Sequence, residues 1–378
     1  MIPYGRQHIS QLEIDAAREV LQSDWLTQGP KVVEFEQALA AYVQAPHAVT
    51  CSNGTAALHA ACAALGLGPG DELWTSPNSF VASANCGLYL GAKVDFVDID
   101  PVSRNMCPQQ LAAKLAKGRV PKIVVAVHFA GVACDMPAIF ALAQQYGFYV
   151  VEDAAHAIGT QVNNVPVGAC RFSHATCFSF HPVKNLTTGE GGAITTADSV
   201  IANRLRRFVT HGITKNPQEF TDPNPPPWYY EQQSLGFNYR LCDIQAAVGV
   251  VQLGKLETFI DKRRQLFERY QTLLAKLPIA LPHVPSRQRV AHHIYAVGVD
   301  PQLRLTVFNA LKSSGIGVNV HYIPIHLQPF YQALGFKAGD YPLAEAYYAG
   351  ALTLPLFVEM TFAQQDYVLE QLERNLCA

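Results

Sequence analysis

KIVVAVHFAGVACDMPAIFALAQQYGFYVVE, residues 122–152, contains the pattern on which the fold prediction rests. Its two ends, 122–129 and 148–152, are short runs rich in Val, Ile and Phe, as buried parallel strands are. Between them, 135–146 is an Ala-rich helical stretch. A strand, a helix and a second strand in this order are typical of a mostly parallel sheet that helices cover on both faces.

The same alternation continues in both directions along the chain. We expect a large domain, 1–255, with a mostly parallel seven-stranded α/β sheet, and a smaller C-terminal α/β domain, 256–378. Such sheets bind ligands at the carboxyl ends of their strands, so functional side chains should follow strands directly. The further strands are predicted at 47–52, 72–77, 93–98, 175–180 and 191–196, and the further helices at 54–66, 79–90 and 107–117.

Two features follow the last predicted strand. The polar stretch 214–230 contains several Pro residues, and Pro removes a backbone donor and fixes φ, so we predict a loop. A loop of this length is either disordered or functional. After it, 243–277 is predicted to be a long helix, with Asp243 placed to cap its start.

Composition excludes several classes of protein. The formal net charge is −2, which argues against general electrostatic binding to nucleic acid or to an anionic membrane. No apolar run is long enough to predict a transmembrane helix, and the first residues lack the apolar stretch of a signal peptide. Nine scattered cysteines without a C-x-x-C pair predict reduced thiols in a cytoplasmic protein, with no metal site. Only 15% of residues are charged, which is compatible with surface buried against another subunit.

The segment VVEDAAHAIG, 150–159, ends a predicted strand with Glu152 and Asp153. An acid at this place often caps the next helix, and that interpretation stays open. The functional interpretation is a carboxylate aimed at the pyridine nitrogen of pyridoxal phosphate (PLP). PLP needs such a partner, because a protonated ring nitrogen draws electrons from the carbanion at the reacting carbon.

The segment ATCFSFHPVKNLTTGEGGAI, 175–194, places Lys184 between an apolar strand and a Gly-rich turn. A lysine on a loop is usually a solvated charge. Here the surroundings can desolvate it, which lowers its pKa and frees the amine for Schiff-base formation. Ser179, five residues earlier, could donate to a phosphate. In a third segment, 51–71, a Gly-containing turn leads into an Ala-rich helix, whose start is either a phosphate site or an ordinary cap.

These three segments resemble one family closely, the DegT/DnrJ-type sugar-nucleotide aminotransferases, which are PLP enzymes of fold type I. The resemblance covers nearly the whole chain, and the lysine motif SFHPVKNLTTGEGG is its most specific part. Within the family, the chain looks most like members that act in pseudaminic acid synthesis on a UDP-linked 4-keto-6-deoxy-N-acetyl sugar. The other matching segments are WLTQGPKVVEFE (25–36), SNGTAAL (52–58), SFVASAN (79–85), EDAAHAIG (152–159), GFNYRLCDIQAAVG (236–249) and VNVHYIPIH (318–326).

The resemblance implies a role for each matching residue. Lys184 holds PLP and moves the proton, Asp153 holds the ring nitrogen with His156 beside it, and Phe80 stacks on the ring. The phosphate is bound by Gly54, Thr55 and Ser179, and by Asn238 of a second subunit, so a homodimer with shared sites is implied. L-Glutamate is the implied amino donor. The positions implied to contact the sugar nucleotide are Tyr4, Asp24, Trp25, Leu26, Thr27, Asn319, Val320, His321 and Tyr322.

Several alternatives stand beside these roles. Phe80 could be an ordinary core residue, since most aromatic side chains are. A metal site at His321 and His326 is disfavoured, because Pro324 lies between them and no acidic ligand is near. Trp228 and Tyr229 form either an exposed patch for a partner or, as we favour, a lid over the sugar.

Two other functions compete with amino transfer. A sugar dehydratase of the family carries histidine at the Schiff-base position, where this chain has Lys184. A non-catalytic sugar-nucleotide sensor is disfavoured by the joint presence of Asp153, Ser179 and Lys184. The stereochemistry of the sugar and the nucleobase are not specified by the sequence.

Overall fold

The computed structural model describes residues 1–376. Its central sheet has seven strands in the order β1-β9-β8-β5-β4-β2-β3. Neighbouring strands are parallel except at β9, which is antiparallel to both β1 and β8. The mostly parallel seven-stranded sheet is therefore confirmed. The strands are β1 (His47–Cys51), β2 (Glu72–Thr75), β3 (Lys93–Phe96), β4 (Ile123–Val127), β5 (Tyr149–Asp153), β8 (Ala175–Ser179) and β9 (Gly192–Thr196).

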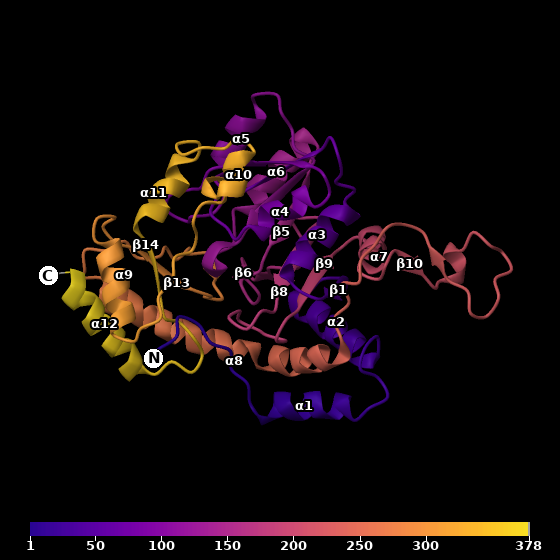
Figure 1. Ribbon diagram of the computed structural model, residues 1–378, viewed down its shortest axis with the longest axis horizontal. Helices are drawn as coiled ribbons and strands as arrows, with labels where there is room; N and C mark the ends of the chain where they lie inside the picture. The colour runs from indigo at the N-terminus through magenta and orange to yellow at the C-terminus, as the bar shows by residue number, and fades with distance from the viewer. Residues whose placement is uncertain (377–378) are drawn as a thin grey trace.

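Helices cover both faces of this sheet (Figure 1). Strand β4 shows why, because all five of its residues are buried. Ile123 and Val125 pack on one face with helices α3 (Gly54–Ala64), α4 (Ala82–Leu88) and α7 (Ser199–Phe208). Val124 and Ala126 pack on the other face. That second face is covered by α2 (Pro30–Val43), α5 (Pro108–Leu115), α6 (Met136–Tyr146) and the long helix α8 (Asp243–Leu274).

A second hydrophobic core surrounds the C-terminal half of α8. The predicted boundary at 255/256 falls inside this continuous helix, so we propose two domains that share α8. Segments of the smaller part also return to the large sheet, where Tyr331 packs against Phe96 of β3. The elements of this part are β13 (Tyr295–Gly298), α9 (Arg304–Ser313), η3 (Ile325–Leu327), α10 (Pro329–Ala333), α11 (Pro342–Gly350), β14 (Ala351–Leu354) and α12 (Phe362–Leu376).

The prediction that Asp243 caps its own helix is wrong. The N-cap of α8 is Cys242. The carboxylate of Asp243 instead accepts hydrogen bonds from the backbone N–H groups of Gly29, at 2.8 Å, and Lys31, at 2.9 Å. These groups belong to the start of α2, where the N-cap Gly29 has no side chain to satisfy them. Asp243 therefore caps a helix more than 200 residues away in sequence.

The Pro-rich stretch forms an arm, residues 211–240, that projects from the body beyond α7 (Figure 1). A short antiparallel pair, β10 (Ile213–Thr214) with β11 (Glu231–Gln232), closes its base. Inside the arm, Glu231 accepts hydrogen bonds from the Thr221 backbone and hydroxyl and from the Tyr229 hydroxyl. The side chain of Trp228 is 80% exposed.

The remaining elements are short or lie at the margin of the fold. None of the helices in residues 1–376 is both long and apolar enough to cross a membrane. The elements are α1 (Gln11–Leu21), η1 (Phe129–Gly131), η2 (Pro217–Glu219) and a small sheet of β6 (Gln161–Val162), β7 (Val165–Pro166) and β12 (Gln288–Arg289).

Candidate active site

A cavity of about 880 Å³ opens at the carboxyl ends of the sheet strands. This is the edge where a doubly wound sheet presents its ligand. Most of the residues singled out in the sequence meet here, although they come from distant segments. Those that line the cavity are Tyr4, Gly54, Thr55, Phe80, Asp153, His156, Ser179, Lys184, Asn319, Val320, His321 and Tyr322.

Lys184 lies in the turn that follows β8, and its backbone N–H donates to the His181 carbonyl at 2.9 Å. Burial of the amine lowers the pKa of Lys184 to about 8, and the negative charge of Asp153 opposes this shift only in part. With a pKa of about 8, roughly a tenth of the Lys184 amines are neutral at pH 7, far more than for an exposed lysine. A neutral amine is the form that attacks a carbonyl carbon.

Asp153 ends strand β5 and is buried. One carboxylate oxygen, Oδ2, accepts a hydrogen bond of 2.6 Å from Ser83 on α4, and the other accepts one of 3.2 Å from the Ala155 backbone N–H. Ser83 in turn lies 2.6 Å from the Ser79 hydroxyl. These contacts hold the carboxylate at the cavity wall, which suits a partner for a protonated ring nitrogen.

The start of α3 forms a cradle for an anion. Asn53 caps the helix by accepting from the Ala56 N–H, so the earlier N–H groups stay free to bind a ligand. A Cβ atom on Gly54 would lie 2.8 Å from the Cβ of Ser179, hence only glycine lets the β8 serine approach this closely. The helix N-terminus and a serine hydroxyl together fit a phosphate group.

Three histidines face Lys184 across the cavity: His156, His293 and His321. Burial is the main cause that lowers the pKa of each, and for His321 it lowers the value to about 4. The Ala130 N–H donates to Nδ1 of His156, so Nε2 carries the proton and faces the Tyr322 hydroxyl at 3.1 Å. The histidines therefore stay neutral and add no positive charge beside the lysine.

Phe80 stands at the lip of the cavity and is 59% exposed, which excludes its interpretation as a core residue. The two histidines considered for a metal bind different partners: His321 Nδ1 lies 2.8 Å from the Thr353 hydroxyl and His326 Nε2 lies 2.9 Å from Glu345. In residues 1–376 no group of three or more His, Cys, Asp or Glu side chains is arranged to hold a metal ion.

Some predicted residues do not line the cavity of their own chain. Asp24 to Thr27 lie where the chain meets the start of α8, with Thr27 bridged to Cys242. Asn238, Trp228 and Tyr229 belong to the projecting arm. The structure therefore does not bring these residues to the cavity of their own chain.

Several residues of the site were not predicted from the sequence, and two of them contact predicted ones. Ser83 lies inside a helix of small residues, and nothing in ASANCGL marks it as a partner of Asp153. His293 lines the cavity, and its ring centroid is 4.3 Å from that of His156. Its buried Nδ1 has no hydrogen-bond partner within the part of the chain that the structure describes. Only the pair His292-His293 in the sequence could have drawn attention to it.

A lysine and a carboxylate that share a cavity, beside a phosphate cradle at the strand ends, define a PLP-dependent transferase. The residues fit this cofactor. The amine of Lys184 can bond to it, the carboxylate of Asp153 can face its ring nitrogen, and the start of α3 together with Ser179 can bind its phosphate. The chain belongs to the DegT/DnrJ/EryC1/StrS aminotransferase family, whose sequence pattern matches residues 7–373. It is thus a PLP-dependent sugar aminotransferase.

Individual relatives agree with this assignment. The spore coat polysaccharide biosynthesis protein SpsC of Bacillus subtilis is 41% identical over 98% of this chain and 95% of its own. The putative sugar aminotransferase Spr1654 of Streptococcus pneumoniae, solved in PMP and PLP forms, has 29% identity in its PMP form, with a TM-score of 0.91 over 99% of both chains. Helicobacter pylori PseC, an aminotransferase of pseudoaminic acid biosynthesis, has 28% identity and a TM-score of 0.91 over 99% of both chains.

Proposed function

We propose that this enzyme moves the amino group of L-glutamate to C4 of a UDP-linked 4-keto-6-deoxy-N-acetyl sugar. The product would be UDP-4-amino-4,6-dideoxy-N-acetyl-β-L-altrosamine, the amino sugar on the way to pseudaminic acid. The observation that carries the proposal is the size and lining of the cavity. At about 880 Å³ it is near the upper end of ordinary ligand pockets, so it has room for a sugar nucleotide in addition to the cofactor.

The residues of the cavity take separate parts in this reaction. PLP, when bound, supplies the electron sink that makes the amino group transferable. Lys184 anchors the cofactor and moves the proton at the reacting carbon, Asp153 keeps the ring nitrogen protonated, and the Gly54 and Ser179 cradle binds the phosphate. Phe80 at the cavity lip covers the ring. We keep Tyr4 and the segment 319–322 as the residues that orient the sugar, since they line the same cavity.

We also propose that the working unit is a homodimer in which each cavity is completed by the other copy. In support, the arm projects from the body (Figure 1), and neither Trp228 nor Asn238 lines the cavity of its own chain, although Tyr239 at the base of the arm does. Large apolar side chains are exposed on the arm and on α1, including Leu12 at 60% and Leu21 at 60%. Exposed apolar side chains gathered in this way favour burial against a partner.

The substrate assignment has a rival with its own support. PseC is named for pseudoaminic acid, yet SpsC, named for spore coat polysaccharide, has the higher identity, 41% against 28%. A different nucleotide-linked keto sugar is therefore the second candidate. The exposed Trp228 favours a 6-deoxy sugar, because an aromatic lid suits a C6 methyl group and would leave a 6-hydroxyl without a partner.

A substrate panel tests the proposal. Enzyme, PLP and L-glutamate are mixed with 4-keto sugar nucleotides of UDP and dTDP, including the L-arabino and D-xylo epimers of the N-acetyl sugar. We expect the UDP-linked L-arabino compound to be aminated fastest, as measured from product by mass spectrometry and NMR. Faster turnover of the D-xylo epimer, or of a dTDP sugar, would overturn the assignment and leave the sugar aminotransferase class intact.

A further inference from the structure

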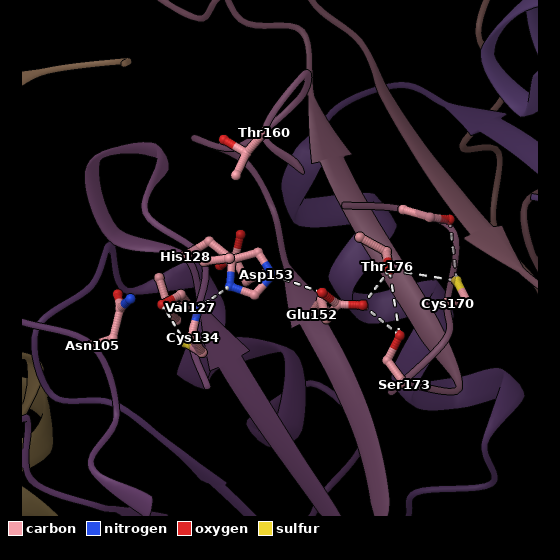
Figure 2. A network of polar contacts seen from close by, with 12 residues as sticks. Asn105, Val127, His128, Cys134, Glu152, Asp153, Thr160, Cys170, Ser173 and Thr176 are labelled. Atoms are coloured by element: carbon pink, nitrogen blue, oxygen red, sulfur yellow. Dashed lines mark hydrogen bonds and ion pairs between the residues drawn. The ribbon is translucent and has the colours of Figure 1, made fainter. Parts of the chain in front are cut away.

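Glu152 immediately precedes Asp153 on strand β5, so its side chain points to the opposite face of the sheet. Figure 2 shows it at the centre of a buried polar network. Its Oε2 lies 2.7 Å from Nε2 of His128, and its Oε1 accepts hydrogen bonds from the Ser173 hydroxyl, at 2.5 Å, and the Thr176 hydroxyl, at 2.9 Å. His128 is fully buried and Glu152 is 5% exposed.

The backbone fixes the tautomer of His128. The Cys134 N–H donates to Nδ1 of His128 at 3.2 Å, so that nitrogen is an acceptor and carries no proton. The proton is therefore on Nε2 and is donated to Glu152. The hydroxyls of Ser173 and Thr176 donate to the other carboxylate oxygen of Glu152. The network therefore consists of one carboxylate, that of Glu152, which accepts hydrogen bonds from His128, Ser173 and Thr176.

This carboxylate joins three adjacent strands. His128 directly follows β4, Glu152 is the penultimate residue of β5, and Thr176 lies near the start of β8. The backbone N–H of His128 also donates to the carbonyl of Asp153 at 3.1 Å. Two of these strands carry groups of the cofactor site, because β5 ends in Asp153 and β8 ends in Ser179.

His128 has a second link to the site. The next residues, 129–131, form the short helix η1, and Ala130 within it donates its N–H to His156 at 3.3 Å. A shift of His128 would thus move both Asp153 and the backbone donor that sets the tautomer of His156. His128, Glu152, Ser173 and Thr176 do not line the large cavity, so they act on the ring from behind the sheet.

We propose that His128 and Glu152 are positioning residues, which fix Asp153 and His156 against the cofactor ring. The inference rests on the role of Asp153 proposed above. A buried pair of this kind is weak evidence for stability, since apolar residues of similar volume often stabilise a protein as well or better. A positioning role explains why the pair of His128 and Glu152 lies directly behind Asp153, the residue that must contact the ring nitrogen.

The variant Glu152→Gln tests the proposal in the PLP-loaded enzyme. The Gln side chain keeps the size but loses the negative charge, and its amide N–H₂ must face either the N–H of His128 or the Ser173 and Thr176 hydroxyls, which now donate to Glu152 and would have to turn to accept. His128 cannot switch tautomer, because Nδ1 must accept from Cys134. We expect PLP to dissociate about tenfold faster, as expected when a hydrogen bond to a charged group is lost. The pH midpoint of the visible absorbance of the bound cofactor should shift as well.

Controls separate positioning from folding. Ser173→Ala removes one hydrogen bond from the same carboxylate but leaves the link to β4, so its PLP dissociation rate should stay close to wild type. If the pair has only a structural role, both variants should have a lower melting temperature as apoproteins, with an unchanged PLP dissociation rate and absorbance midpoint. That result would overturn the proposal. His128→Asn replaces Glu152→Gln in the same test if the latter does not fold. Neither readout depends on the sugar, so a wrong substrate assignment would leave this test intact.

Discussion

Ser83 on α4 donates a hydrogen bond of 2.6 Å to Oδ2 of Asp153, a residue 70 positions later in the sequence. This contact occupies one carboxylate oxygen from the side of the helix, while the Ala155 N–H approaches the other oxygen. Both donors hold the carboxylate in one orientation. A carboxylate fixed in place is what a protonated pyridine nitrogen requires.

Ser83→Ala should therefore weaken catalysis without preventing cofactor binding. A hydrogen bond to a charged group contributes about 1.5–3 kcal/mol, so we expect kcat to fall by at least about tenfold in both half-reactions. Stopped-flow measurement of each half-reaction checks this. Ser79→Ala, which removes the neighbouring hydroxyl but keeps Ser83 on Asp153, is the matched control and should have the smaller effect. Equal rates for Ser83→Ala and wild type would show that Asp153 needs no support from α4.

Asp153→Asn should have a larger effect, because the amide carries no charge to stabilise a ring N–H⁺. Loss of a key electrostatic partner of this kind raises the barrier by about 3 kcal/mol or more, that is, roughly a hundredfold or more in rate. PLP should still bind through its phosphate. The comparison to make is kcat against PLP affinity in the same variant. Near-normal kcat with normal affinity is incompatible with the proposed role.

The sequence predicted the sheet well and the partners of the site residues poorly. The strands are short apolar runs buried on both faces, and such runs are visible in the residues alone, as in Ile123–Val127. Asp153 and Lys184 were recognisable because each follows a strand. Ser83 was not, since its role depends on α4 being packed over β5. The same holds for Asp243, which caps α2 only because folding brings Gly29 beside it.

The pKa of Lys184 gives a prediction on pH. Burial lowers the value to about 8, so the amine is largely protonated below pH 8 and largely neutral above it. Attachment of PLP to the apoenzyme needs the neutral amine. We therefore expect the attachment rate, followed by visible absorbance, to rise with pH up to about 8 and then level off. A rate that still rises steeply at pH 10 would mean that Lys184 keeps the pKa of an exposed lysine. Lys184→Ala is the control and should show no lysine-bound absorbance and no turnover.

Shared sites predict complementation between two inactive or impaired variants. In Lys184→Ala the lysine is lost, and in Asn238→Ala the group reaching the other copy's phosphate is lost. A heterodimer of the two has one cavity with both residues intact. After subunit exchange at equal amounts, about a quarter of wild-type activity is expected, since half of the dimers are mixed and each has one good site. As a control, the Asn224→Ala variant, in the same arm, is used in place of Asn238→Ala. It should be active without subunit exchange. Activity no higher than the average of the two parents would argue that each chain completes its own site.

The arm itself makes the last prediction, which concerns specificity. Trp228 is 80% exposed, whereas Tyr229 is held inside the arm by its hydrogen bond to Glu231 and by edge contact with Phe220, at 5.0 Å between ring centroids. The two residues should thus behave differently. Trp228→Ala should raise KM for the sugar nucleotide and leave the glutamate half-reaction almost unchanged, because remote contacts orient only the larger substrate.

Tyr229→Ala should act through the arm and therefore lower its thermal stability as well as raise KM, while Tyr229→Phe, which loses only the hydroxyl, should fall between this variant and wild type. Leu305, an apolar residue on α9 that is 69% exposed, is changed to Ala as the control for a surface change away from the arm. Each variant is assayed in both half-reactions. If Trp228→Ala also slows the glutamate half-reaction, the arm supports the cofactor and is not a lid over the sugar. If it changes neither half-reaction but weakens the dimer in ultracentrifugation, Trp228 belongs to the subunit interface.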